Sequence, residues 1–112
     1  MDTRDHDRSV IERVLSDYAA IPYSYGKLES QTVFDRDRDH YLLMVLGEDY
    51  RGRRSHGSLV HIDIRDGDVV VQRDGTEEGI AVDLIRAGIP PERIILAFHL
   101  HGPKRYSEFL AA

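Results

Sequence analysis

Cysteine is absent from the 112-residue sequence. The chain therefore has no disulfide framework, no thiol nucleophile and no cysteine-ligated metal site. It also lacks an apolar run of transmembrane length, and the charged residues 1–8 are not followed by the apolar segment of a signal peptide. These absences predict a cytoplasmic protein that does not enter a membrane.

An excess of positive charge is missing too. The 20 acidic residues outnumber the 15 Lys and Arg residues, which gives a formal net charge of −5. Proteins that bind DNA on their own neutralise phosphates with Lys and Arg. The one dense basic run here, residues 51–54, is typical of a solvated loop. The charge therefore argues against a protein that binds DNA on its own.

The rest of the composition is typical of a globular domain. Hydrophobic residues make up 41% of the chain and charged residues 31%. A chain of this length can bury a core without disulfides or metals. We find no internal repeat, linker or low-complexity segment, so residues 1–112 are expected to form one domain.

Apolar residues recur every three or four positions over residues 7–20, which predicts an amphipathic helix. Pro22 ends this helix, and residues 23–26 form a loop that carries two tyrosines. Tyrosines in such a loop cover the edge of a core or stack on a ring of a ligand.

Two strands follow the predicted helix. Residues 31–34 and 40–46 flank an Asp/Arg-rich hairpin loop at residues 35–39. The near-continuous apolar run of the second strand indicates a central strand that is covered on both faces. The charged, glycine-bearing residues 47–57 are expected to form an exposed connection.

A β-hairpin is predicted after that connection. Residues 58–64 read as a strand, and Asp66-Gly67 is a two-residue turn signal because a type I′ turn needs positive φ at both positions. This turn places Ile64 opposite Val69 and, two residues further along each strand, Ile62 opposite Val71, all facing the core. The opposite face of the hairpin then carries His61, Asp63, Val70 and Gln72.

A helix is predicted next, packed back on the sheet. Residues 74–75 form a turn, and Thr76 is expected to cap the helix by accepting from the backbone amides that follow. The two glutamates after Thr76 suit the positive end of the helix dipole. Gly88 is expected to end the helix in the left-handed conformation.

The chain closes with a brief helical turn at residues 90–93, a strand at residues 94–98 and a short helix at residues 107–112. The strand–helix–strand order permits a parallel crossover. The elements together predict an α+β fold with two layers, in which helices pack on a mainly antiparallel sheet. The residues expected to be buried are Ile62, Ile64, Val69, Val71, Leu84, Ile85, Leu96 and Phe98.

The sequence also resembles a known family. The string Asp74-Gly75-Thr76-Glu77, followed by Gly79-Ile80-Ala81, is similar to the hallmark of the XisI family, the fdxN-element excision controlling factors first named in cyanobacteria. The resemblance covers nearly the whole chain and also includes residues 34–35, 40–41, 56–57, 60–64, 72, 83–84, 87–90, 94–99 and 105–109.

The sequence departs from the family pattern at three places. Glu48 stands where the family often has Trp, and Ser58 stands where it often has Cys. Residues 100–103 stand where the family often has a proline-containing step after Phe-His. If the Trp forms part of a partner surface, Glu48 changes that surface.

The resemblance implies an accessory or controlling subunit, usually encoded beside XisH, a protein that resembles restriction-type nucleases. It supplies no catalytic residues and no cofactor, and we assign none. Interface anchors are expected in residues 47–56, 23–26 and 106–109, which carry aromatic and arginine side chains. Self-association through an edge strand or an exposed sheet face is also expected.

The alternative is a metal-dependent hydrolase or a metal-binding domain. His61 and Asp63 alternate on one strand, and His99 and His101 repeat the spacing near the end of the chain. If the two strands lie close together, these four side chains could surround an ion such as Zn²⁺. The carboxylates of residues 77, 78 and 83 could serve acid–base chemistry, although helix capping already accounts for the two glutamates.

Overall fold

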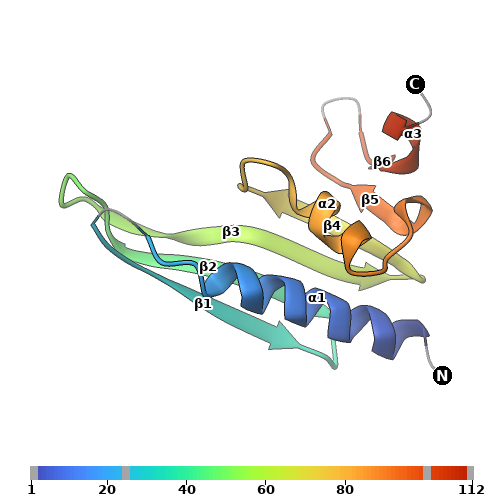
Figure 1. Ribbon diagram of the computed structural model, residues 1–112, viewed down its shortest axis with the longest axis horizontal. Helices are drawn as coiled ribbons and strands as arrows, with labels where there is room; N and C mark the ends of the chain where they lie inside the picture. The colour runs from blue at the N-terminus through green and yellow to red at the C-terminus, as the bar shows by residue number, and fades with distance from the viewer. Residues whose placement is uncertain (1–2, 24–25, 100–101, 111–112) are drawn as a thin grey trace.

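Six β-strands form one sheet whose spatial order follows the order of the sequence, from β1 to β6 (Figure 1). The computed structural model describes residues 3–23, 26–99 and 102–110. Its elements are α1 (Thr3–Ala19), β1 (Lys27–Asp35), β2 (His40–Glu48), β3 (Arg54–Arg65), β4 (Asp68–Asp74), α2 (Ile80–Arg86), the 3₁₀ turn η1 (Pro91–Arg93), β5 (Ile94–Leu96), β6 (Lys104–Arg105) and α3 (Ser107–Leu110). Neighbouring strands are antiparallel except β4 and β5, which are parallel. The predicted α+β fold with a mainly antiparallel sheet is confirmed.

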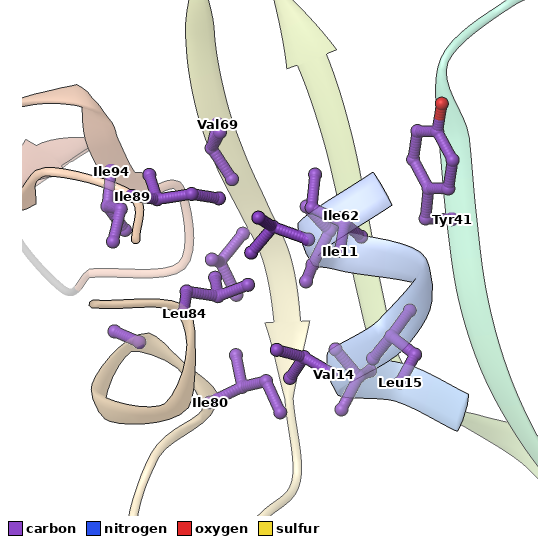
Figure 2. Close-up of a cluster of buried hydrophobic side chains, with 14 of the residues drawn as sticks. Ile11, Val14, Leu15, Tyr41, Ile62, Val69, Ile80, Leu84, Ile89 and Ile94 are labelled. Atoms are coloured by element: carbon purple, nitrogen blue, oxygen red, sulfur yellow. The ribbon is translucent and has the colours of Figure 1, made fainter. Parts of the chain in front are cut away.

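Helices α1 and α2 cover one face of the sheet, where the core lies (Figure 2). Ile11, Leu15 and Leu84 are fully buried between the helices and the strands. Within the described residues, no helix is long and apolar enough to cross a membrane. Five of the positions predicted to be buried are buried: Ile62, Ile64, Val69, Val71 and Leu84.

The other three positions lie nearer the surface. Ile85 and Leu96 are only partly buried, although both pack against the core. The prediction for Phe98 is wrong, because its side chain is 50% exposed. Strand β5 ends at Leu96, two residues before Phe98, so this ring lies beyond the sheet.

The hairpin between β3 and β4 has the predicted register. Asp66 and Gly67 have φ angles of 52° and 82°, which are the positive values that a type I′ turn requires. Ile64 pairs with Val69, and Ile62 pairs with Val71. The two residues of this turn therefore set which side chains of both strands reach the core.

Residues 47–57 are mostly exposed, as predicted, but the prediction that they form a connection is wrong for residues 47–48 and 54–57. Strand β2 continues to Glu48, β3 begins at Arg54, and these two residues pair with each other. Only residues 49–53 form the turn, in which the Asp49 carboxylate accepts from the backbone N–H groups of Arg51 and Arg53. In Figure 1 the strands β1–β3 therefore project well past the C-terminal end of α1.

The prediction that β2 is covered on both faces is also wrong. Tyr41 and Leu43 point into the core and are fully buried, whereas Leu42 and Met44, which alternate with them, are only partly buried. Strand β2 is central within the sheet, since it lies between β1 and β3. Its near-continuous apolar run thus reflects one covered face and one that keeps some contact with solvent.

Two β-bulges interrupt the antiparallel ladders. Leu59 is the extra residue of β3, because Leu43 pairs with Val60 while Met44 pairs with Ser58. Gln72 is the extra residue of β4, because it falls between the partners of His61 and Ile62. Bulges redirect the side chain of the inserted residue, and both of these side chains belong to the sites described below.

Candidate functional site

A cluster of polar side chains surrounds Asp63 on the sheet face opposite the helices. Asp63 Oδ1 lies 2.7 Å from His40 Nδ1 and 2.8 Å from His61 Nε2. Asp63 Oδ2 accepts from Gln72 Nε2 at 3.2 Å and from Arg65 Nη2 at 3.1 Å. Three strands therefore meet at one carboxylate, since His40 lies on β2 and Gln72 on β4.

Asp63 is almost completely buried, whereas its partners reach solvent. Its side chain is 2% exposed, compared with 40% for His40, 32% for His61 and 62% for Arg65. Burial acts to raise the pKa of the Asp63 carboxyl, but hydrogen bonds from His40 and His61 hold this pKa below its ordinary value. The carboxylate is thus ionised and fully hydrogen-bonded at neutral pH.

The strand register explains why these residues meet. His40 pairs directly with Asp63 across β2 and β3. His61 lies two residues from Asp63 on the same strand, so both side chains point to the same face. The bulge at Gln72 brings its amide to the carboxylate. The Asp66-Gly67 turn signal correctly predicted that His61, Asp63 and Gln72 share a face. Nothing in the sequence near His40 indicated that it would join them.

The predicted grouping of His61 and Asp63 with His99 and His101 differs from the observed one. Among the described residues, the His and carboxylate groups that gather within 4.8 Å of one another are His40, His61 and Asp63. His99 follows the end of β5, and its ring packs 5.3 Å from the ring of Phe109. His101 lies outside the described residues.

An apolar groove of about 500 Å³ forms a second candidate site, at the end of the sheet that projects past α1. Its lining includes Tyr18, Ile21, Tyr23, Leu28, Tyr50 and Leu59. Three of these residues are exposed to solvent: Tyr50 is 68% exposed, Ile21 59% and Tyr23 40%. Exposed aromatic and apolar side chains in one concave site are typical of a binding surface.

The groove depends on local backbone features that the sequence pattern did not predict. The bulge at Leu59 makes this side chain pack beside the core as well as line the groove. Leu59 O accepts from the backbone N–H of Gly75 at 2.8 Å, and a Cβ at Gly75 would lie 2.8 Å from Leu59 Cδ1. A side chain at Gly75 would therefore require the Leu59 side chain, which lines the groove, to shift.

The groove joins two of the three segments predicted to carry interface anchors. Tyr23 comes from the loop after α1, and Tyr50 comes from the turn between β2 and β3. The Arg51 guanidinium lies 5.3 Å from the centre of the Tyr50 ring and adds positive charge at this edge. Tyr25, in the loop after α1, lies outside the described residues.

The third predicted segment lies in a different part of the molecule. Tyr106 and Phe109 are ring neighbours at 6.1 Å, and Lys104 lies over the Phe109 ring at 5.9 Å. Figure 1 shows β6 and α3 at the opposite end from the β2–β3 turn. The aromatic C-terminal segment therefore does not share a surface with the groove.

Comparisons with known proteins agree with these features of the fold. The family model described as XisI protein matches residues 1–111. A crystal structure of a XisI-like protein from Anabaena variabilis ATCC 29413 is 29% identical, with a TM-score of 0.73 over 82% of this chain and 84% of that one. The structure of the fdxN element excision controlling factor XisI from the same organism is 27% identical, with a TM-score of 0.69 over 88% of this chain and 94% of that one. None of the curated proteins matches the sequence.

Proposed function

This chain belongs to the XisI family, and on that premise we propose that it is a noncatalytic controlling factor that acts by binding another protein. The partner that the family resemblance implies is an XisH-type, nuclease-like protein in a system that excises DNA elements. The chain acts as one domain in the cytoplasm, and it meets DNA only through this partner. An acidic chain suits this role, because its net charge of −5 disfavours independent binding to phosphates.

The observation that carries the proposal is the apolar groove beside Tyr50. A Tyr side chain that is 68% exposed next to a concave apolar surface can be desolvated by a partner, and its hydroxyl can keep a hydrogen bond there. Tyr and Arg are enriched among the residues that dominate binding energy. Tyr23, Tyr50 and Arg51 supply both kinds at one edge of the groove.

The basic residues of the β2–β3 turn extend this surface. Arg53 ends the turn that contains the groove residue Tyr50, Arg54 begins β3, and both arginines are exposed. Exposed charges at the rim of an interface act mainly on the rate of association and on specificity. A nuclease-like partner with acidic side chains facing this turn would be steered toward the groove.

The first experiment is co-expression of the chain with the product of the neighbouring gene, followed by pull-down of either protein. We expect a stable complex, and we expect exchange of Arg53 and Arg54 for Glu to weaken it. A neighbour unlike XisH, or no complex at micromolar concentration, contradicts the proposal. If the charge reversal leaves the affinity unchanged, the aromatic C-terminal segment is the next place to search for the interface.

Self-association through β1 is a second contact that we propose. Among the described residues, strand β1 is an edge of the sheet and pairs with β2 alone. A two-fold axis at Gln31, perpendicular to the sheet, would place Lys27 opposite Asp35 and Leu28 opposite Phe34 of a second copy. Opposite charges and apolar pairs across antiparallel strands are stabilising.

Analytical ultracentrifugation tests this register with one substitution. Gln31→Glu would place two carboxylates directly opposite each other at the axis, so we expect the dimer to dissociate more readily. Gln31→Thr keeps a neutral strand-forming residue and serves as the control. Equal dimerisation of both variants, or a monomeric wild-type protein, contradicts pairing through β1.

A further inference from the structure

We propose that His40, His61 and Asp63 form a binding site for a divalent transition-metal ion on the open face of the sheet. This site is separate from the groove and does not depend on the proposed partner. Its residues come from β2 and β3, at the one described place where two imidazoles and a carboxylate gather. Two histidines and one carboxylate are a recurring ligand set of protein metal sites.

The geometry requires only small movements to admit an ion. Both imidazole nitrogens lie within 2.8 Å of Asp63 Oδ1, and the three ligand atoms are within 4.8 Å of one another. A tetrahedral Zn²⁺ site with bonds of about 2.0–2.1 Å spaces its ligand atoms roughly 3.3 Å apart. Each imidazole nitrogen would therefore move about 0.5 Å away from Asp63 Oδ1, and the two nitrogens, which lie within 4.8 Å of each other, would take the same spacing of roughly 3.3 Å. Their hydrogen bonds to Asp63 would be exchanged for bonds to the ion.

The surroundings of Asp63 are suited to a metal ligand. Gln72 and Arg65 both donate to Oδ2, which leaves Oδ1 as the atom that faces the two imidazoles. Hydrogen bonds of this kind orient a metal-binding carboxylate. Arg65 is 62% exposed, so its guanidinium can move away from the incoming positive charge while Gln72 keeps the carboxylate in place.

Access to the site is open from solvent. The side chains of His40 and His61 are 40% and 32% exposed, whereas Asp63 is anchored beneath them at 2%. An ion held by three protein ligands would keep water in its fourth position. The mixture of nitrogen and oxygen ligands, without sulfur, favours ions such as Zn²⁺ and Co²⁺ over the hard ions Mg²⁺ and Ca²⁺.

Calorimetric titration of untagged protein with Zn²⁺ tests the site. We expect saturable binding, with His40→Ala and His61→Ala each reducing the affinity by more than about tenfold. His56→Ala is the matched control, because His56 is exposed on the distal part of β3 and lies outside the cluster. Titration with Co²⁺ provides an optical signal for the same variants, and a thermal melt without metal checks that each is folded.

Two results would overturn the proposal. One is wild-type protein that shows neither a binding isotherm nor a rise in melting temperature with micromolar Zn²⁺. The other is binding that survives in both His40→Ala and His61→Ala, which would place the ion on other histidines. Because His40 and His61 are half exposed, these variants are expected to fold even if Asp63→Asn does not.

Discussion

Asp74 Oδ2 accepts a hydrogen bond at 2.7 Å from the backbone N–H of Ile80, six residues further along the chain. Ile80 is the first residue of α2. The residue before it, Gly79, has no side chain that could cap the helix. Asp74 Oδ1 meanwhile accepts from the backbone N–H and the hydroxyl of Thr76. One carboxylate therefore organises the whole connection between β4 and α2.

Replacing Asp74 should weaken α2. We expect Asp74→Ala to lower the free energy of unfolding by about 1–2 kcal/mol, because the orphan amide at the helix start loses its acceptor. Urea denaturation measures this change. Glu78→Ala is the control and should cost less than about 0.5 kcal/mol, since Glu78 is exposed and precedes the helix. Equal effects of the two substitutions would contradict the capping role.

An ion pair between Asp7 and Arg93 connects the first turns of α1 to η1, the 3₁₀ turn before β5. Both carboxylate oxygens of Asp7 accept from the Arg93 guanidinium, and the Asp7 side chain is 1% exposed. We expect Asp7→Ala to destabilise the fold by about 3 kcal/mol, because it removes the buried carboxylate and leaves the partly buried Arg93 guanidinium with its hydrogen bond to Gly67 O.

The matched control for Asp7→Ala lies on the same helix. Asp5 also pairs with an arginine, Arg8, but its side chain is 61% exposed. Asp5→Ala should therefore change the unfolding free energy by less than about 1 kcal/mol. Thermal and urea denaturation of both variants compare the two pairs. A small effect of Asp7→Ala would show that the first turn of α1 can detach without loss of the core.

Acid sensitivity should depend on Asp39. A hydrogen bond from Arg8, and a further one from Tyr41, hold the pKa of the Asp39 carboxyl below the ordinary value of 3.8. Because the pKa is lower in the folded state, this stability is present above the unfolded-state pKa and is lost as the pH falls through the folded-state pKa.

Urea denaturation over a series of acidic pH values measures that contribution. Asp39→Asn should reduce the loss of stability on going below the unfolded-state pKa of 3.8. Tyr41→Phe removes only the hydroxyl that donates to Asp39 Oδ1 at 2.9 Å, so it should reduce the loss by a smaller amount. An unchanged pH dependence in Asp39→Asn would assign the acid sensitivity to other carboxylates.

Gly47 is essential to the pairing of β1 with β2. Its φ is 128°, and an added Cβ would lie 2.0 Å from the carbonyl oxygen of Lys27. We expect Gly47→Ala to cost about 1–3 kcal/mol, because neither the backbone angle nor the strand spacing admits a side chain. Gly57→Ala on β3 is the control, since a Cβ there meets nothing within 4 Å. Similar stabilities of the two variants would contradict this close approach.

The core hairpin could be predicted from sequence because one turn determines its register. Asp66-Gly67 fixes the pairing of Ile64 with Val69 through positive φ angles. Because side chains alternate between the two faces of a strand, this pairing also determines the face of every other residue in the hairpin. The same information predicted correctly that His61 and Asp63 point away from the core. Gly88 also ends α2 as predicted: its φ is 118°, and Ile89 N donates to Leu84 O.

The remaining features depend on contacts between distant residues. Residues 54–57 are charged or small, yet they form a strand because β2 supplies a partner, and strand preference depends strongly on such context. His40 meets Asp63 only after β2 and β3 have paired. The prediction that Thr76 caps α2 is wrong. The backbone N–H and the hydroxyl of Thr76 both donate to Asp74, and α2 begins at Ile80, four residues after Thr76.

We propose that this XisI-family chain binds its partner through the groove beside Tyr50. The most direct test is the dissociation constant for the XisH-like neighbour, measured for wild type, Tyr50→Ala and Tyr23→Ala. Phe98→Ala is the control, because Phe98 is 50% exposed beyond β5 and does not line the groove. We expect each tyrosine variant to weaken binding by about tenfold or more, which is about 1.4 kcal/mol, while Phe98→Ala binds as wild type. Wild-type affinity in both tyrosine variants would contradict the claim.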